Sequence, residues 1–296
     1  MADIAKHTRA GIIAAKVMEK GLKSIEVGAK LLDVAVLVED TIRREGAHPA
    51  FPCNISMNDV AAHYTPQAGD EAAFKKGDMV KLDLGVHVDG YIADIAVTKD
   101  LGGNKKLVKA SADALGAAID IIKPGIMTNE IGAVVEDTIK GAGFEPVSNL
   151  TGHYLSRWNL HGGVIVPNVR ARHGEEIREG DIIALEPFAT TGAGRVVDDP
   201  EAIIFRYLED RPIRMREARS LLRHAKENYG NLPFAERWIS HLMPKLRLNM
   251  ALRQLVSTKA LYAYRILREK ERGLISQAEH TVLVNKGGCE VITGGA

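Results

Sequence analysis

The sequence has few of the residues that mark a secreted or membrane protein. Its 296 residues include two cysteines, Cys53 and Cys289, which are too few for a disulfide framework and are typical of a reducing interior. No apolar run approaches the ~20 residues that a membrane helix needs. The first residues also lack the apolar segment of a signal peptide. We therefore expect a cytoplasmic protein without membrane contact.

The chain also lacks a strong charge of either sign. Its 39 Lys and Arg residues nearly balance 38 Asp and Glu residues, for a net charge of +1, so no global field points to nucleic acid or to a membrane surface. Hydrophobic residues make up 46% of the chain, which is enough for a full core. The length allows one large domain or two smaller ones.

The most informative stretch is Met79–Thr98, MVKLDLGVHVDGYIADIAVT. Apolar residues alternate with others on both sides of Asp89-Gly90, which predicts two antiparallel strands joined by a two-residue turn. In that register Asp83 and Asp94 share one face and lie one diagonal step apart, roughly 7–8 Å at the backbone. Two carboxylates can therefore converge on one point, although two solvated aspartates would give the same pattern.

The chain repeats this arrangement. The similar pairs are VEDTI at 38–42 and 135–139, KKGDMVKLDLG at 75–85 and REGDIIALEPF at 178–188, and YIADIAVTK at 91–99 and SQAEHTVLV at 276–284. Glu186 takes the place of Asp83, and Glu279 takes the place of Asp94. Three similarities in the same order predict a duplicated α/β half, with two strand pairs facing each other across a pseudo-two-fold axis.

Four carboxylates brought together cannot all stay ionised unaided, because like charges and desolvation raise their pKa values. Two divalent cations would cancel a charge of minus four, and oxygen ligands suit such ions. Two metal ions about 3.5–4 Å apart are the arrangement that many hydrolases use to activate water. The duplication therefore predicts a dinuclear metal hydrolase.

Helical periodicity predicts two helices within residues 4–46 and further helices at 105–123 and 129–140. Pro124-Gly125 and Gly141 would end the latter two. We interpret the histidines that lie outside any motif as surface residues. These are His7, His48, His87, His173, His224 and His241.

Several motifs resemble those of a known family. They are AFPCNISMNDVAAHYTP (50–66), the Asp83/Asp94 pair, GHYLSRWNLHGG (152–163), ALEPFAT (184–190) and SQAEHT (276–281). Together they resemble the type 2 methionine aminopeptidases, pita-bread metallopeptidases related to prolidase, aminopeptidase P and creatinase. The resemblance covers essentially the whole chain. It implies an α+β fold of two duplicated halves, with a central curved antiparallel sheet and helices outside.

The resemblance also implies roles for particular residues. The implied metal ligands are Asp83, Asp94, His153, Glu186 and Glu279, with Asp94 and Glu279 bridging two divalent ions (Co²⁺, Mn²⁺, Fe²⁺ or Zn²⁺). Glu186 would move the proton of the attacking water, and His63 and His161 would contact the scissile amide nitrogen and a substrate carbonyl. The implied methionine pocket consists of Phe51, Leu160, Phe188 and Tyr264.

Residues 206–272 differ in composition, with 16 Lys or Arg against 7 acids, whereas the rest of the chain has 23 against 31. This block separates the strands of the second pair, so we interpret it as a helical insertion of the type 2 kind within a catalytic domain of residues 1–205 and 273–296. Its basic surface is either a solvated helical face or a contact with ribosomal RNA.

The implied activity is removal of the initiator methionine from nascent chains whose second residue is small, by a cytoplasmic monomer. One alternative is a peptidase of the Xaa-Pro type, and another is a non-catalytic pita-bread module that binds the ribosome or RNA. The spacer LSRWNLH departs from the family pattern, because Arg157 and Trp158 make it bulkier and more cationic. No long polybasic segment precedes the first helix, so we expect a minimal form of the archaeal kind.

Overall fold

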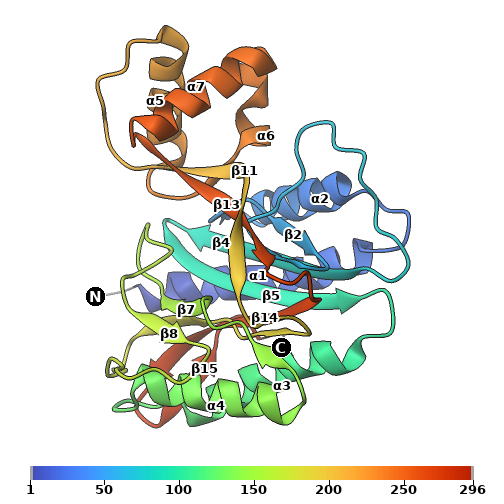
Figure 1. Cartoon of the computed structure of the whole chain (residues 1–296). Coiled ribbons are helices and arrows are strands. Elements are labelled where there is room, and N and C mark those ends of the chain that lie inside the picture. Colours follow the sequence, from blue (N-terminus) through green and yellow to red (C-terminus); the bar gives the residue numbers. More distant parts are fainter. Residues whose placement is uncertain (1–2, 295–296) are drawn as a thin grey trace.

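The computed structural model describes residues 3–294 (Figure 1). Its helices are α1 (Ile4–Ser24), α2 (Leu31–Arg44), α3 (Lys105–Ile121), α4 (Thr128–Gly141), α5 (Arg216–Tyr229), α6 (Glu236–Ile239), the 3-10 helix η1 (Ser240–Leu242) and α7 (Lys245–Ser257). None of these helices is long and apolar enough to cross a membrane. The predicted N-terminal pair and the helices near 105–123 and 129–140 are all present.

The strands form one large sheet and one smaller sheet. They are β1 (His48–Pro49), β2 (Asn54–Met57), β3 (Val60–Ala62), β4 (Met79–Val88), β5 (Tyr91–Asp100), β6 (Glu145–Pro146), β7 (Thr151–Tyr154), β8 (Ile165–Pro167), β9 (Ile182–Leu185), β10 (Phe188–Thr190), β11 (Val196–Tyr207), β12 (Phe234–Ala235), β13 (Leu261–Glu269), β14 (Ile275–Asn285) and β15 (Gly288–Val291).

The predicted hairpin is present in the expected register. Strands β4 and β5 pair antiparallel, with Asp83 opposite Ala96 and Gly85 opposite Asp94. Asp89 and Gly90 both have positive φ, 51° and 87°, as a two-residue turn of type I′ requires. Asp83 and Asp94 therefore lie on the same face of the sheet.

Strand β14 joins the two halves of the large sheet, whose order is β1-β4-β5-β14-β9-β7-β8. It pairs with β5 on one side, where Glu279 lies opposite Ala96, and with β9 on the other, where Thr281 lies opposite Ala184. Strands of the first and second halves are thus direct neighbours. This mixed architecture with an antiparallel sheet confirms the predicted α+β class.

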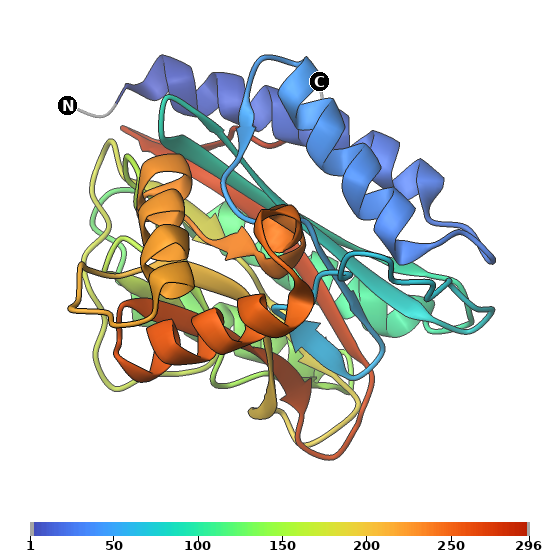
Figure 2. The same ribbon diagram turned by 90° about the horizontal axis from the view of Figure 1, so that it is seen from above.

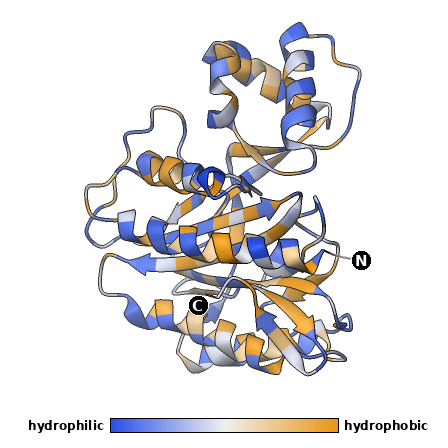
Figure 3. Ribbon diagram, turned by 180° about the vertical axis from the view of Figure 1, so that it is seen from behind, coloured by the Kyte–Doolittle hydropathy of each residue, from blue (hydrophilic) through white to orange (hydrophobic). Residues whose placement is uncertain are grey.

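The helices cover the sheet in two pairs. Helices α1 and α2 pack with β4 and β5 around one hydrophobic core, and α3 and α4 pack with β9 and β14 around a second. In Figure 2 the long strands lie between α1 and α2 on one side and the helices α5 and α7 on the other. Figure 3 shows hydrophilic and hydrophobic residues alternating around the covering helices, as amphipathic helices require.

Strands β11 and β13 form a long antiparallel ribbon that carries helices α5 to α7 at one end (Figure 1). These helices share a hydrophobic core of their own with the upper part of the ribbon. Strand β11 runs across the expected boundary at residues 205/206, and its pairing is irregular between Asp198 and Ala202. The sequence analysis predicted the helices of this block but not the ribbon.

A buried ion pair joins this helical block to the large sheet's first half. The Glu39 carboxylate on α2 accepts hydrogen bonds from the Arg237 guanidinium, from Trp238 Nε1 at 2.8 Å and from the Cys53 N–H at 3.1 Å. Arg237 also donates to Thr65 Oγ1 at 2.7 Å. The two charged side chains are only 4% and 5% exposed. This contact fixes the block against the segment that carries residues 51–54.

The surface assignment was wrong for two histidines. His7 and His87 are both buried. The His7 ring Nδ1 lies 2.7 Å from the Ile92 carbonyl oxygen, and the Gly90 N–H donates to His87 Nδ1 at 3.2 Å. Each ring is held by a backbone group of the first hairpin, a contact that no local motif reveals.

Candidate metal centre and substrate cavity

Five side chains from both halves of the chain meet above the centre of the large sheet. Asp83 lies on β4, Asp94 on β5, His153 on β7, Glu279 on β14, and Glu186 directly after β9. All five line one cavity. The alternation of side chains along each strand aims them to the same face. The structure therefore brings together the complete set of predicted metal ligands.

The distances within this cluster suit a shared cation. Ligand atoms of Asp94, His153 and Glu279 all lie within 4.8 Å of one another. His153 Nε2 is 3.9 Å from Asp94 Oδ2 and 3.7 Å from Glu186 Oε1, too long for hydrogen bonds.

Several polar atoms of the cluster are buried without a hydrogen-bond partner in the described part of the chain. They are Asp83 Oδ1, Asp94 Oδ1, Glu279 Oε1 and His153 Nδ1. An orphaned buried carboxylate oxygen is costly unless it binds a cation. The residues therefore fit divalent metal ions.

The electrostatics lead to the same conclusion. Burial raises the pKa of the Asp83 carboxyl to about 7, although Gln277 opposes the shift. Burial and the neighbouring carboxylates raise the pKa values of Asp94, Glu186 and Glu279 well above their usual range. Burial and the nearby His161 lower the pKa of His153 to about 3, which keeps this ring in the neutral form that binds metals. Protein groups alone do not stabilise four ionised carboxylates here.

Two polar residues of the site were not predicted. The Gln277 amide donates weakly to Glu279 Oε2 at 3.3 Å and to Glu186 Oε2 at 3.5 Å, and it lies two residues before Glu279 on the same face of β14. Asn54 lines the cavity and lies opposite Asp83 in the pairing of β2 with β4. Period-two alternation around Glu279 could have identified Gln277, whereas Asn54 requires the register of β2.

His63 and His161 both line the cavity. His63 follows β3 with a positive φ of 64°, and its Nδ1 lies 3.0 Å from the Arg265 carbonyl oxygen on β13. The His161 ring lies 4.6 Å from the His153 ring, centroid to centroid. Desolvation lowers the pKa values of both His63 and His161, and the nearby His63 ring and Arg206 guanidinium lower the pKa of His161 further. Both are therefore neutral hydrogen-bonding groups near pH 7.

The predicted methionine pocket is only partly as expected. Phe51, Leu160 and Tyr264 line the cavity, together with Ile204 and Pro233 from the ribbon and the helical block, which the sequence analysis missed.

Phe188 does not line this cavity. Its side chain is fully buried in a separate cluster with Val147, Val196 and Ile275. Pro187 separates β9 from β10, and Phe188 opens the new strand opposite Gln277 of β14. Phe188 therefore lies on the same face of the sheet as Gln277 and Glu279, but it packs beside the cavity in this cluster and does not line it.

The unusual spacer between His153 and His161 packs against the first hairpin. The Trp158 backbone N–H donates to the Gly90 carbonyl oxygen at 2.8 Å, and the indole ring lies 5.0 Å from the His87 ring, centroid to centroid. Arg157 Nε donates to the Asp89 carbonyl oxygen at 3.0 Å. Neither side chain lines the metal cavity. The spacer therefore connects the two halves at the β4–β5 turn.

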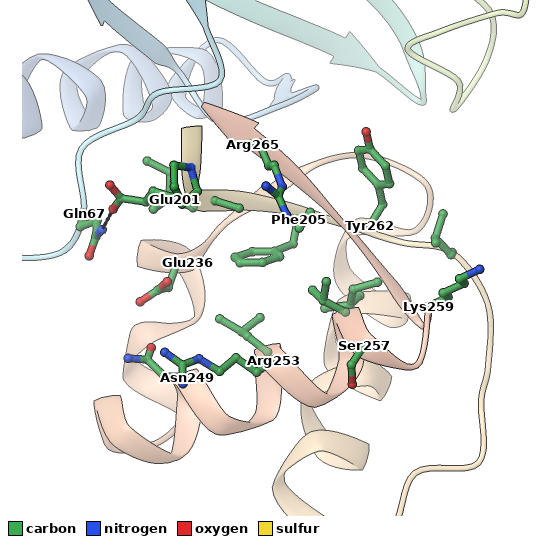
Figure 4. Close-up of a pocket in the computed structure, with 18 of the residues that line it drawn as sticks. Gln67, Glu201, Phe205, Glu236, Asn249, Arg253, Ser257, Lys259, Tyr262 and Arg265 are labelled. Atoms are coloured by element: carbon green, nitrogen blue, oxygen red, sulfur yellow. Dashed lines mark hydrogen bonds between the residues drawn. The ribbon is translucent and has the colours of Figure 1, made fainter. Parts of the chain in front are cut away.

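A larger cavity of about 900 Å³ lies between α7 and the β11–β13 ribbon. Figure 4 shows Arg253 and Ser257 of α7 on one side of it and Phe205 and Arg265 of the ribbon on the other. Within residues 3–294, no cluster of potential metal ligands lies along the walls of this larger cavity. It is separate from the metal centre, although both cavities share the ribbon as a wall.

The duplicated sheet and its buried cluster of carboxylates and histidine define a metal-dependent hydrolase. Residues 5–219 match the metallopeptidase family M24, and the chain belongs to this family.

Known proteins of this kind resemble the chain over its full length. A methionine aminopeptidase of Thermococcus onnurineus (strain NA1) is 50% identical over 287 residues, which cover 96% of this chain and 97% of that protein. The structure of a methionine aminopeptidase from Thermotoga maritima has a TM-score of 0.73 and 23% identity, covering 98% and 96% of the two chains. The structure of a thermophilic Arx1 has a TM-score of 0.84 and 18% identity, covering 99% and 90%. At these low identities the two structures support the fold alone.

Proposed function

We infer that this protein is an aminopeptidase that hydrolyses the first peptide bond of polypeptides beginning with methionine, when the second residue is small. The observation that carries this conclusion is the 50% identity to a methionine aminopeptidase along the whole chain. The cavity supports it, because apolar side chains of Phe51, Leu160 and Ile204 lie beside the carboxylate cluster. An unbranched thioether suits such a slot.

The metal site is the second part of the proposal. Asp83, Asp94, His153, Glu186 and Glu279 would hold two divalent ions, with Asp94 and Glu279 shared between them. Co²⁺, Mn²⁺, Fe²⁺ and Zn²⁺ all accept such carboxylate and imidazole ligands. When bound, the ions supply Lewis-acid activation of water and of the scissile carbonyl. The orphaned carboxylate oxygens support this assignment.

The remaining steps belong to side chains of this chain. Glu186 accepts the proton of the attacking water and passes it to the leaving amine. The His63 Nδ1–H donates to the Arg265 carbonyl oxygen, which fixes the orientation of the ring. The other ring nitrogen, Nε2, then accepts a hydrogen bond from the scissile amide N–H. His161 donates to the carbonyl of the second substrate residue. Tyr264 and Leu160 exclude water beside the reacting bond.

Peptide assays with the metal-loaded enzyme test this function. Met-Ala peptides should be cleaved faster than Leu-Ala peptides, and chelation should abolish turnover until Mn²⁺, Fe²⁺ or Co²⁺ is restored. Faster cleavage of Ala-Pro would move the assignment to the Xaa-Pro peptidases, and absence of all cleavage would favour a binding module. Glu279→Ala and Asp94→Ala should each lose both ions, so either variant retaining them would contradict the bridging assignment.

The partners are nascent polypeptide N-termini, and the insertion of residues 206–272 is proposed to dock a cytoplasmic, monomeric enzyme on ribosomal RNA. Its helices expose many cations, among them Arg216, Arg223 and Arg247. Their replacement by glutamate should abolish co-sedimentation with ribosomes at low salt while peptide turnover stays unchanged. Equal co-sedimentation of the triple variant would contradict this docking surface.

A further inference from the structure

Strand β13 has an open edge beside the substrate cavity. One edge pairs with β11 along its length, whereas on the other edge β3 reaches only Leu267 and Arg268. Residues 261–265 therefore have no strand on their outer edge in the described part of the chain. Edge strands of this kind are templates for another extended chain.

The pairing with β11 determines which backbone groups point outward. The Leu208 N–H donates to the Ala260 carbonyl oxygen, and the same register places Tyr262 and Tyr264 opposite residues 206 and 204. Since bonded pairs alternate in an antiparallel ladder, Ala263 directs its N–H and C=O away from β11. Neither group has a hydrogen-bond partner elsewhere among residues 3–294.

This edge is continuous with the reaction site. The Arg265 carbonyl oxygen lies on it and contacts His63 Nδ1, and the side chain of Tyr264 lines the metal cavity. Tyr262, which is 49% exposed, contacts Tyr264 at 4.8 Å between ring centroids. In Figure 4 the Tyr262 ring points away from helix α7. The aromatic pair therefore lies along the path from the cavity to solvent.

We propose that the outer edge of β13 at Ala263 binds the third and fourth residues of the substrate as an added antiparallel strand. The proposal rests on the aminopeptidase function, which places the scissile amide at His63. Two residues of strand separate Arg265 from Ala263, about 7 Å, which is the length of two substrate residues. A chain that leaves His63 toward Ala263 runs opposite to β13, as antiparallel addition requires.

The proposed substrate is thus an extended polypeptide recognised through its backbone rather than its downstream side chains. One substrate residue opposite Ala263 exchanges two hydrogen bonds with it, and such pairs alternate along the chain. Two net hydrogen bonds correspond to roughly a tenfold gain or more in kcat/KM. Dipeptides, which end before this edge, gain nothing from it.

The experiment compares Met-Ala with Met-Ala-Ser, Met-Ala-Ser-Ser and longer peptides on the metal-loaded enzyme. We expect kcat/KM to rise about tenfold up to the tetrapeptide and little beyond it. N-methylation of single amides should then remove the gain at either the third or the fourth residue, but not at both. A uniform effect at both positions, or no length dependence, would overturn the proposal.

Variants of Ala263 give an independent test. Ala263→Pro removes the outward N–H but no bond to β11, so it should abolish the length dependence and preserve Met-Ala cleavage. Ala263→Val is the matched control, because it retains the N–H and its side chain enters the 900 Å³ cavity. If the proline variant does not fold, the N-methyl series on the unaltered enzyme decides. Failure to cleave Met-Ala at all would instead refute the proposed function.

Discussion

Replacement of Glu39 by glutamine should destabilise the protein far more than the same change at Glu136, its counterpart in the second VEDTI copy. The Glu39 side chain is 4% exposed and faces the buried Arg237, which is 5% exposed. The amide would leave that guanidinium without a counter-charge. Removing one partner of a buried ion pair typically costs about 3–5 kcal/mol.

Glu136 provides the matched control. It occupies the same position of the repeated pentapeptide, but its charged partners Lys140 and Arg170 are 49% and 57% exposed. Its hydrogen bond from the Arg170 backbone N–H can also be accepted by the oxygen of a glutamine amide. Surface pairs contribute about 0–1 kcal/mol. Urea denaturation of the metal-loaded variants should therefore separate the two by at least about 2 kcal/mol.

A double variant tests the cause of the loss. Arg237→Met removes the uncompensated charge, so Glu39→Gln combined with Arg237→Met should be more stable than Glu39→Gln alone. The single variant should also raise KM for Met-Ala, because Cys53 next to Asn54 is held by the same carboxylate. Equal stabilities of the Glu39 and Glu136 variants, or no recovery in the double variant, would refute this reasoning.

Three further predictions concern the site and its support. The raised carboxyl pKa values, about 7 for Asp83, should make the metal-free protein lose stability as pH rises from about 4 to 7; calorimetry should therefore find a larger stabilisation by metal at pH 8 than at pH 5. His63→Ala should retain metal and lower kcat/KM on the order of 10²–10³-fold, whereas His153→Ala should lose metal by elemental analysis. Burial lowers the pKa of Lys81 from 10.5 to about 7, because the folded state disfavours the charged ammonium group. The contribution of Lys81 to stability is therefore largest above about pH 10.5, where the amine is neutral in both states, and decreases as pH falls to about 7. Urea denaturation should show the unaltered protein gaining stability relative to Lys81→Met between pH 7 and pH 9.5.

The first hairpin was predictable to the residue because local chemistry determines it. Asp89-Gly90 selects a two-residue turn, the turn sets the register, and the register places Asp83 and Asp94 on one face. The positions of Glu186 and Glu279 in the second half were predictable from the similarity of their segments to those of Asp83 and Asp94. The residues brought together in the cavity were therefore predictable before their distances were known.

The β11–β13 ribbon was not predictable in the same way. The sequence of β11, VVDDPEAIIFRY, contains Pro200 and two adjacent acids, and its pairing shifts register twice. The sequence of β11 therefore lacks the regular alternation of apolar and polar residues that predicts a strand, and it resembles the sequence of a loop. Ile204 and the edge at Ala263 were missed for this reason. Burial of His7 was missed because its partner, the Ile92 carbonyl, lies 85 residues away.

The central position of β14 has a consequence for synthesis of the chain. This strand pairs with β5, β9, β10 and β15, yet its residues 275–285 follow those of the other three ligand-bearing strands in sequence. Until β14 has been synthesised, β5 and β9 each have an unpaired edge. Unpaired strand edges of this kind can pair with other chains and lead to misfolding or aggregation. If Glu279 is a metal ligand as proposed, the metal site can be completed only after this residue has left the ribosome. The protein therefore becomes active only after β14 has been synthesised, and conditions that slow translation would prolong the interval in which the edges of β5 and β9 are exposed.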